Sequence, residues 1–385
     1  MSRKSKQKTL DVICLGRAAV DLYGQQVGGR LEDMQTFAKY LGGSSANLAA
    51  GLARLGRKSA MLTRVGNEQM GRFVREQLAR EGVDVSHVTT DTSRLTGLVI
   101  LGIGTAHDIP HIFFRERCAD MGLCTADIDD SFVASARMLA ITGTHLSAEG
   151  TRAAVAKAIS AAKKSGTRVV LDIDYRPVLW GLASAGEGAS RFAASQDITH
   201  LLQGFLPDCD LIVGTEEEIA IAGGHTDVLQ ALRAIREVSE AAIVLKRGAL
   251  GCSIFESGPV DSLDAGIAAG GINVEVFNTV GAGDAFLAGY LCGVLEHLPP
   301  GGSAALGNAC GALVVSRHGC APAMPSREEL ELFLSRGEWP HRLRDSQALN
   351  HIHRVTTGRS PWPEVLALAF DHRKQLEELG PPEKI

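Results

Sequence analysis

The sequence predicts an α/β protein built on a mostly parallel β-sheet. Short apolar runs alternate with segments of helical spacing, and this alternation is typical of βαβ units. Glycine-rich turns and acidic residues follow several predicted strands, which is where sheets of this kind bind their ligands. The 385 residues, of which 45% are hydrophobic, are enough for one large domain or for one domain with an appendage.

The expected elements follow one another along the chain. Strands are expected at residues 11–16, 60–65, 137–142, 168–173, 210–213, 243–246 and 252–255, where the runs are short and apolar. Helices are expected at 45–55, 71–81, 150–165 and 285–295, where apolar residues recur at helical spacing or alanine predominates. Two further strands, at 99–103 and 111–114, indicate a second, smaller sheet.

The composition argues against several classes of protein. A formal net charge of −5 disfavours binding to nucleic acid or to an anionic membrane. None of the eight cysteines forms a CxxC pair, which predicts a reducing, cytoplasmic location without disulfides. No apolar run reaches the ~20 residues of a membrane helix. The basic start of the chain lacks the apolar region of a signal peptide, and residues 1–9 are expected to form a disordered tail.

The most informative segment is 278–290, in which small residues open a predicted helix. Gly281, Ala282 and Gly283 allow the backbone to aim its N–H groups at one point, and such groups at a helix N-terminus favour an anion. Asp284 follows directly, and a carboxylate beside an anion site can take the proton of a hydroxyl that attacks a bound phosphate. The alternative is a glycine-rich turn that only caps the helix.

Four residues nearer the N-terminus are candidates for binding a polyol. Gly42 and Gly43 permit close approach of the backbone, and Asn47 can both donate to and accept from a hydroxyl. Asp21 follows the first strand, and its carboxylate is a natural acceptor for two vicinal hydroxyls. Each has a structural alternative, because Asp21 could be a solvated loop acid and Asn47 a helix-cap residue.

Taken together, the segments 42–47 and 278–290 resemble the two signature segments of the PfkB (ribokinase-like) family of carbohydrate kinases. The intervening segments 212–218, 245–251 and 308–319 resemble further motifs of that family, in the right order. The resemblance spans about residues 10–335. It implies a ribokinase-like three-layer αβα sandwich with a small β lid, in which the kinase domain covers 10–340 and the lid comes from about 18–40 and 95–117.

The resemblance also implies an enzyme that uses ATP and Mg²⁺. Asp284 would be the general base, and the N–H groups of residues 281–283 would stabilise the transferring phosphoryl group. The sugar would be bound by Asp21, Gly42, Gly43 and Asn47. ATP would contact Thr215, Lys246, Gly248, Gly251, Asn308 and Gly319.

Two positions depart from the family pattern, and both concern cations. Relatives usually carry an Asp where this chain has Asn278, and that position helps them to hold a monovalent cation, so K⁺ at Asn278 is an open expectation. Gly214 stands where the family usually has Asn. Mg²⁺ would therefore depend on Glu217 acting through water, and magnesium commonly keeps several waters.

Two arginines narrow the expected substrate. Arg115 and Arg176 lie in the segments 113–116 and 172–177, and the second segment resembles the Arg-bearing segment of 2-keto-3-deoxygluconate kinases. Because Arg suits a carboxylate through paired N–H donors, a sugar acid is expected rather than ribose, with surface salt bridges as the alternative. The pattern is most similar to kinases of 5-dehydro-2-deoxy-D-gluconate in myo-inositol degradation. The alternatives are a 2-keto-3-deoxygluconate kinase, a fructokinase and, in a different class, a non-catalytic sugar-binding regulator.

Residues 341–385 fall outside the kinase pattern. The run 363–373 resembles the first strand of an aldolase-like barrel, although a complete barrel needs ~250 residues. This extension is expected to be either the start of such a domain or a docked strand and helix. Lid strands with exposed edges tend to pair, so a homodimer through the lid is also expected.

Overall fold

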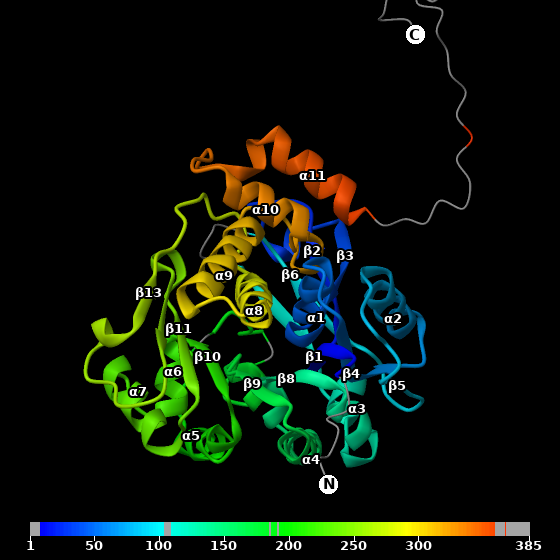
Figure 1. Cartoon of the computed structure of the whole chain (residues 1–385). Helices are drawn as coiled ribbons and strands as arrows, with labels where there is room; N and C mark the ends of the chain where they lie inside the picture. The colour runs from blue at the N-terminus through cyan, green and yellow to red at the C-terminus, as the bar shows by residue number, and fades with distance from the viewer. Residues whose placement is uncertain (1–7, 104–108, 185, 191, 359–365, 367–385) are drawn as a thin grey trace, which may run out of the picture.

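The computed structural model describes residues 8–103, 109–184, 186–190, 192–358 and 366. These residues form a nine-stranded sheet with helices on both faces, which confirms the predicted α/β sandwich (Figure 1). The strand order is β13-β12-β11-β10-β9-β8-β1-β4-β5, and pairing is parallel except at the β11–β12 and β12–β13 edge. The strands are β1 (Leu10–Leu15), β4 (Ser59–Gly66), β5 (Val88–Asp91), β8 (Ala136–Thr142), β9 (Arg168–Asp172), β10 (Leu211–Thr215), β11 (Ala242–Lys246), β12 (Cys252–Phe255) and β13 (Ile267–Ala269).

The two faces of the sheet carry separate apolar cores. In β1, Val12 and Cys14 point into one core and Ile13 and Leu15 into the other, so this central strand is apolar throughout. The first core is covered by α1 (Ser44–Arg54), α2 (Gln69–Glu81), α8 (Ala282–Leu295), α9 (Pro300–Val315) and α10 (Arg327–Ser335). The second is covered by α3 (Asp130–Ala134), α4 (Glu149–Ser165), α5 (Gln196–Gln203), α6 (Glu216–Gly223) and α7 (Val228–Val238), on the opposite side in Figure 1.

A second, four-stranded sheet corresponds to the expected lid. Its order is β3-β2-β6-β7, formed by β2 (Ala19–Gly24), β3 (Phe37–Gly42), β6 (Gly97–Leu101) and β7 (His111–Phe114). The sequence indicated β6 and β7 as strands, whereas β2 and β3 were expected only as part of a lid segment. The residues of β2 are almost all buried, because β2 pairs with β3 on one side and with β6 on the other.

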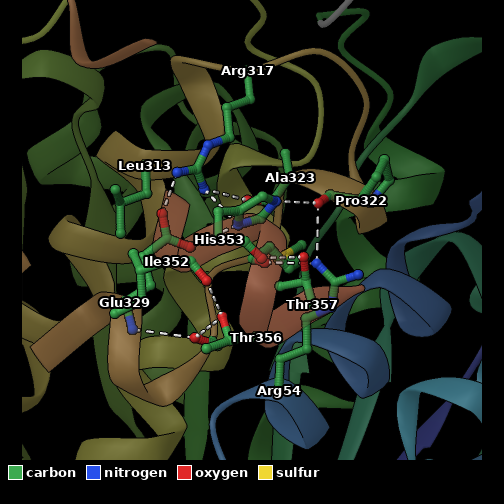
Figure 2. A network of polar contacts seen from close by, with 12 residues as sticks. Arg54, Leu313, Arg317, Pro322, Ala323, Glu329, Ile352, His353, Thr356 and Thr357 are labelled. Carbon is green, nitrogen blue, oxygen red and sulfur yellow. Dashed lines mark hydrogen bonds and ion pairs between the residues drawn. The ribbon is translucent and has the colours of Figure 1, made fainter. Parts of the chain in front are cut away.

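The described part of the C-terminal extension packs against the domain that precedes it. Helix α11 (Gln347–Thr357) lies beside α10, and Leu343 and Leu349 belong to the first core. Figure 2 shows its polar anchor: His353 Nδ1 lies 2.7 Å from Glu329 Oε2, and Nε2 lies 2.9 Å from the carbonyl oxygen of Pro322. A polar and apolar contact surface therefore continues across the expected boundary at residue 340.

The expectations about the two ends of the chain fall largely outside the described residues. Of the expected tail, 1–7 lies outside them, whereas Lys8 Nζ donates to the carbonyl oxygens of Ala134 and Ser165. The run 363–373 also lies outside them apart from the exposed Leu366, so its resemblance to a barrel strand stays a prediction. Among the helices that are described, none combines the length and the apolar character needed to cross a membrane.

Candidate active site

A cleft of about 570 Å³ lies where the carboxyl ends of the central strands meet the small sheet. This is the location predicted from the parallel sheet, because successive strands deliver the residues that follow them to one edge. Polar lining residues come from both sheets and from the N-terminus of α8. They include Arg17, Asp21, Asn47, His111, Asp172, Asp174, Arg176, Thr215, Glu217, Glu218, Lys246, Asp284 and Asn308.

Asp284 lies in the first turn of α8 and is partly buried at the cleft. Its Oδ2 accepts a hydrogen bond of 2.8 Å from Asn47 Nδ2, which comes from α1. Burial, reinforced by the nearby charge of Asp174, raises the pKa of Asp284 to about 7, while the bond from Asn47 lowers it. A carboxylate that ionises near neutral pH is well matched to accepting a proton from a hydroxyl.

The turn before Asp284 adopts the backbone that its glycines permit. Gly281 caps α8 with φ 87°, a left-handed conformation in which a Cβ would also lie 2.9 Å from Cys320 Sγ. Gly281, Ala282 and Gly283 all line the cleft. The Ala282 N–H already donates to the carbonyl of Thr279 at 3.3 Å, so the three predicted anion-binding amides are not equivalent.

The residues predicted to bind sugar are brought together, although with different roles. Asp21 lines the cleft, and burial, opposed by Arg17, raises its pKa to about 7. A Cβ at Gly42 would lie 2.0 Å from Asp21 Oδ1, so Gly42 makes room for this carboxyl group rather than lining the cleft. Gly43 begins α1 with φ 98°. Asn47 uses its amino group on Asp284 and leaves Oδ1 without a described partner, so that oxygen can still accept from a ligand hydroxyl.

Lys246, at the end of β11, forms a charged cluster with two carboxylates, Asp172 at the end of β9 and Glu218 in α6. Its Nζ lies 3.1 Å from Asp172 Oδ1 and 3.6 Å from Glu218 Oε2. Burial by itself would lower the pKa of Lys246, but the two carboxylates hold it above its ordinary value. The same environment raises the pKa of Asp172 to about 6, because burial outweighs the attraction of Lys246. A ligand phosphate would therefore meet a fully protonated ammonium group.

The other predicted ATP contacts shape the loops around the cleft. Gly251 has φ 89°, and a Cβ there would lie 2.1 Å from the carbonyl oxygen of Ala269. Asn308 donates from Nδ2 to the carbonyl oxygens of Ala269 and Gly270, at 3.2 and 2.9 Å. Both residues therefore hold the chain that follows β13 against the cleft. Gly248 also lines the cleft, at the start of the turn that ends at Gly251.

The segment 215–218 places its side chains in different environments. Thr215 caps α6, since its hydroxyl accepts from the Glu218 N–H and its own N–H donates to Glu218. Glu218 is buried against Lys246, whereas Glu217 is exposed at the cleft. Within the described residues no three His, Cys, Asp or Glu side chains are grouped to bind a metal directly. An oxygen donor such as Glu217 fits Mg²⁺ held mainly through waters.

Asn278 connects the turn before α8 to the segment that follows α9. It is fully buried, its Oδ1 accepts from the Val280 N–H at 2.9 Å, and its Nδ2 lies 3.3 Å from the carbonyl oxygen of Gly319. Backbone groups therefore occupy both the oxygen and the nitrogen of the Asn278 side chain. Binding of K⁺ at this position stays a prediction. Gly319 has φ 84° and is not among the residues that line the cleft.

The two arginines predicted to bind a carboxylate differ in their surroundings. Arg176 lines the cleft, and its Nε and Nη1 have no hydrogen-bond partner among the described residues. Arg115 is instead buried in an ion pair with Asp120, with Nε donating to Oδ2 at 2.8 Å, and it does not line the cleft. The expectation of Arg115 as a ligand of the substrate thus lacks geometric support.

Sequence reasoning missed Arg17 and His111 as residues of the cleft. Arg17 follows Gly16, whose φ of 152° turns the chain at the carboxyl end of β1. This position could have identified Arg17 as a cleft residue, because a charged residue directly after a central strand lies at the ligand-binding edge of the sheet. His111 begins β7 with a buried side chain whose pKa is lowered to about 4 by burial and by the charges of Arg176 and Arg17.

Comparison with known proteins agrees with this architecture. A sequence model of the family described as pfkB family carbohydrate kinase matches residues 9–327, and one described as an uncharacterized protein conserved in bacteria matches 329–383. The protein named 5-dehydro-2-deoxygluconokinase from Geobacillus kaustophilus is 35% identical over 334 residues, which cover 86% of this chain and 95% of that protein.

Two solved structures are similar over most of their length. A PfkB protein from Polaromonas sp. JS666 has a TM-score of 0.71 at 29% identity, covering 84% of this chain and 99% of its own. A fructokinase from Vibrio cholerae O395, in its fructose, ADP and calcium ion bound form, has a TM-score of 0.69 at 26% identity, covering 85% of this chain and 100% of its own. The family match covers most of the chain, and the chain therefore belongs to the pfkB family of carbohydrate kinases.

Proposed function

We propose that this carbohydrate kinase transfers the γ-phosphoryl group of ATP to the terminal hydroxyl of a sugar acid, namely 5-dehydro-2-deoxy-D-gluconate, and forms its 6-phosphate. The observation that carries the proposal is the half-buried Asp284, hydrogen-bonded to Asn47, in the same cleft as the Arg176 N–H groups that have no partner among the described residues. The name of the Geobacillus relative, which is aligned over 95% of its length, supports the choice of acid.

In the proposed reaction, Asp284 accepts the proton of the attacking hydroxyl. Asn47 Nδ2 holds the carboxylate in place, and its free Oδ1 accepts from a hydroxyl of the sugar. Asp21 accepts from a further hydroxyl. The N–H groups of Gly281 and Gly283, with Ala282 in a weaker role, stabilise charge on the transferring oxygens, because catalysis of phosphoryl transfer consists mainly of positioning and electrostatic stabilisation.

The nucleotide is proposed to lie over Lys246, with Thr215, Gly248, Gly251, Asn308 and Gly319 contacting or shaping its site. The similar fructokinase, which binds ADP and a calcium ion, supports a nucleotide with a divalent cation in this fold. Glu217 would hold Mg²⁺ through water, and the ion would neutralise charge on the phosphates. Lys246 has its charge secured by Asp172 and Glu218, so it can contact a phosphate without losing its proton.

The test is ADP release with a panel of acceptors under identical conditions. The panel holds 5-dehydro-2-deoxy-D-gluconate, 2-keto-3-deoxygluconate, fructose and ribose. The proposal expects the highest kcat/KM with 5-dehydro-2-deoxy-D-gluconate. Preference for 2-keto-3-deoxygluconate or for fructose would reassign the substrate, and absence of ADP release with every acceptor would point to a sugar-binding regulator.

A further inference from the structure

We propose that Arg17, together with Arg176, binds the carboxylate of the substrate and so makes the enzyme select acids over neutral sugars. The inference rests on the proposed sugar-acid kinase function and deepens it. It replaces Arg115, the second arginine expected from the sequence, with a residue that the fold brings into the cleft.

Arg17 is a buried cation that forms no ion pair with the described residues. Its side chain lines the cleft, only 7% of the residue is exposed, and its Nε has no hydrogen-bond partner in the described part of the chain. The guanidinium lies over the ring of Phe113, with 5.7 Å between Cζ and the ring centroid. The charge of Arg17 acts on Asp21 and Asp284 across the cleft, but no described carboxylate forms an ion pair with it. A buried charge that is not paired at contact distance is costly, so this geometry favours a ligand that carries a negative charge.

Arg176 presents a second set of unsatisfied donors in the same cleft. Its Nε and Nη1 lack partners among the described residues, and its closest carboxylate oxygen, Asp174 Oδ1, lies 3.6 Å from Nε. That separation is too long for a hydrogen bond. A carboxylate can accept from two guanidinium groups at once, since each of its two oxygens has two acceptor sites.

His111 indicates that the two guanidinium groups face one region. After burial, the charges of Arg176 and then Arg17 are the causes that keep the pKa of this imidazole low, at about 4. His111 Nε2 is buried and has no described partner, so it remains available to the same ligand. His111 and Phe113 both belong to β7, which places Arg17 against the small sheet and on the side of the cleft assigned to the sugar.

Arg115 is already neutralised within the protein. Nε and Nη2 both donate to Asp120 Oδ2, and the two side chains are almost fully buried. Removing Arg115 would leave Asp120 buried and unpaired, which destabilises the fold whatever the substrate. Variants of Arg115 therefore report on stability, whereas variants of Arg17 report on recognition of the substrate.

The experiment compares Arg17→Met, Arg17→Lys and the control Arg115→Lys with the wild type. For Arg17→Met, KM for 5-dehydro-2-deoxy-D-gluconate should rise about 10- to 100-fold, the scale for losing hydrogen bonds to a charged group, whereas KM for ATP should change less than about threefold and kcat/KM with fructose should fall much less than kcat/KM with the acid. For Arg17→Lys, KM for the acid should lie between the values of the wild type and of Arg17→Met, because lysine keeps the charge but lacks the planar set of N–H donors. Arg115→Lys should leave the ratio of acid to fructose kcat/KM unchanged.

The outcomes separate this inference from the function on which it rests. If the wild type phosphorylates the acid and Arg17→Met has an unchanged KM for it, Arg17 is not a ligand and only this inference fails. An equal loss for the acid, for fructose and for ATP would assign Arg17 to the phosphoryl group or to folding, and would also overturn it. If the wild type phosphorylates no acid at all, the proposed function fails first and the inference fails with it. A thermal shift on adding the acid without ATP, present in the wild type and absent in Arg17→Met, would support direct binding.

Discussion

At the scale of single residues, the chemistry of the site depends on where the fold places each polar side chain. Asn47 and Asp284 are 237 positions apart in the chain, yet one hydrogen bond fixes the proposed base toward the cleft. Glu217 and Glu218 are adjacent, yet one is exposed at the cleft and the other is buried against Lys246. Local sequence could suggest acids in these segments, but only the folded environment distinguishes their chemistry.

Replacing the proposed base tests its role directly. Asp284→Asn preserves the size and polarity of the side chain but cannot accept the proton, so phosphorylation should fall at least ~100-fold, the usual scale of general-base assistance. Nucleotide affinity, measured by calorimetry, should stay within a few-fold of that of the wild type. Turnover similar to the wild type in this variant would exclude Asp284 as the base.

The raised pKa of Asp284 predicts a pH dependence of the reaction. A base must be ionised in the free enzyme, so kcat/KM should rise with pH through a midpoint at about 7 and level off above it. Asn47→Ala removes the hydrogen bond that lowers this pKa, and its midpoint should therefore move to higher pH. Profiles of kcat/KM between pH 5 and 9 check the shift; an unchanged midpoint would mean that Asn47 does not control the base.

At the scale of elements, α11 shows how a segment outside the expected kinase pattern becomes part of the fold. His353 contacts both Glu329 of α10 and the Pro322 carbonyl, and Arg54 of α1 also donates to that carbonyl at 3.0 Å (Figure 2). Pro322 follows Gly319 and Cys320, and Cys320 lines the cleft. The extension thus supports a turn that borders the active site.

Loss of this anchor should cost stability. His353→Ala removes two polar contacts and leaves Glu329 partly unsatisfied, so the free energy of unfolding should fall by about 1–3 kcal/mol. His351→Ala is the matched control, because it lies exposed on the same helix and forms none of these contacts. Denaturant unfolding of both variants checks the difference, and equal stabilities would show that the network contributes nothing.

At the scale of the whole molecule, the cleft joins the large sheet to the small one. Its lining includes Asp21 and His111 from the small sheet and Lys246 from the large one. A ligand that fills the cleft must therefore contact both sheets. A homodimer through the small sheet stays a prediction, as does the division of the chain at residue 340.

Occupancy of the cleft should stabilise the two sheets unequally. The sugar acid should slow amide hydrogen exchange mainly in β2 and β7, whereas a nucleotide should slow it mainly in β12 and β13, next to Gly251 and Asn308. Each saturating ligand should also raise the free energy of unfolding, by about 2.7 kcal/mol at 100 times its Kd. Exchange measured with each ligand alone checks this assignment, and protection of the same strands by both would contradict it.

The sequence by itself determined the alternation of strands and helices, the family and the position of the glycine-rich turn before Asp284. These follow from local properties: apolar periodicity in β1, β8 and α4, and small residues before Asp284 where a helix begins. Only the tertiary structure decided which charges are available. Arg115 and Arg17 are both buried arginines, but Arg115 forms an ion pair with Asp120, whereas no described carboxylate forms one with Arg17. The pairing of charges depends on which strands and helices become neighbours in space, and that information is not contained in any single segment of the chain.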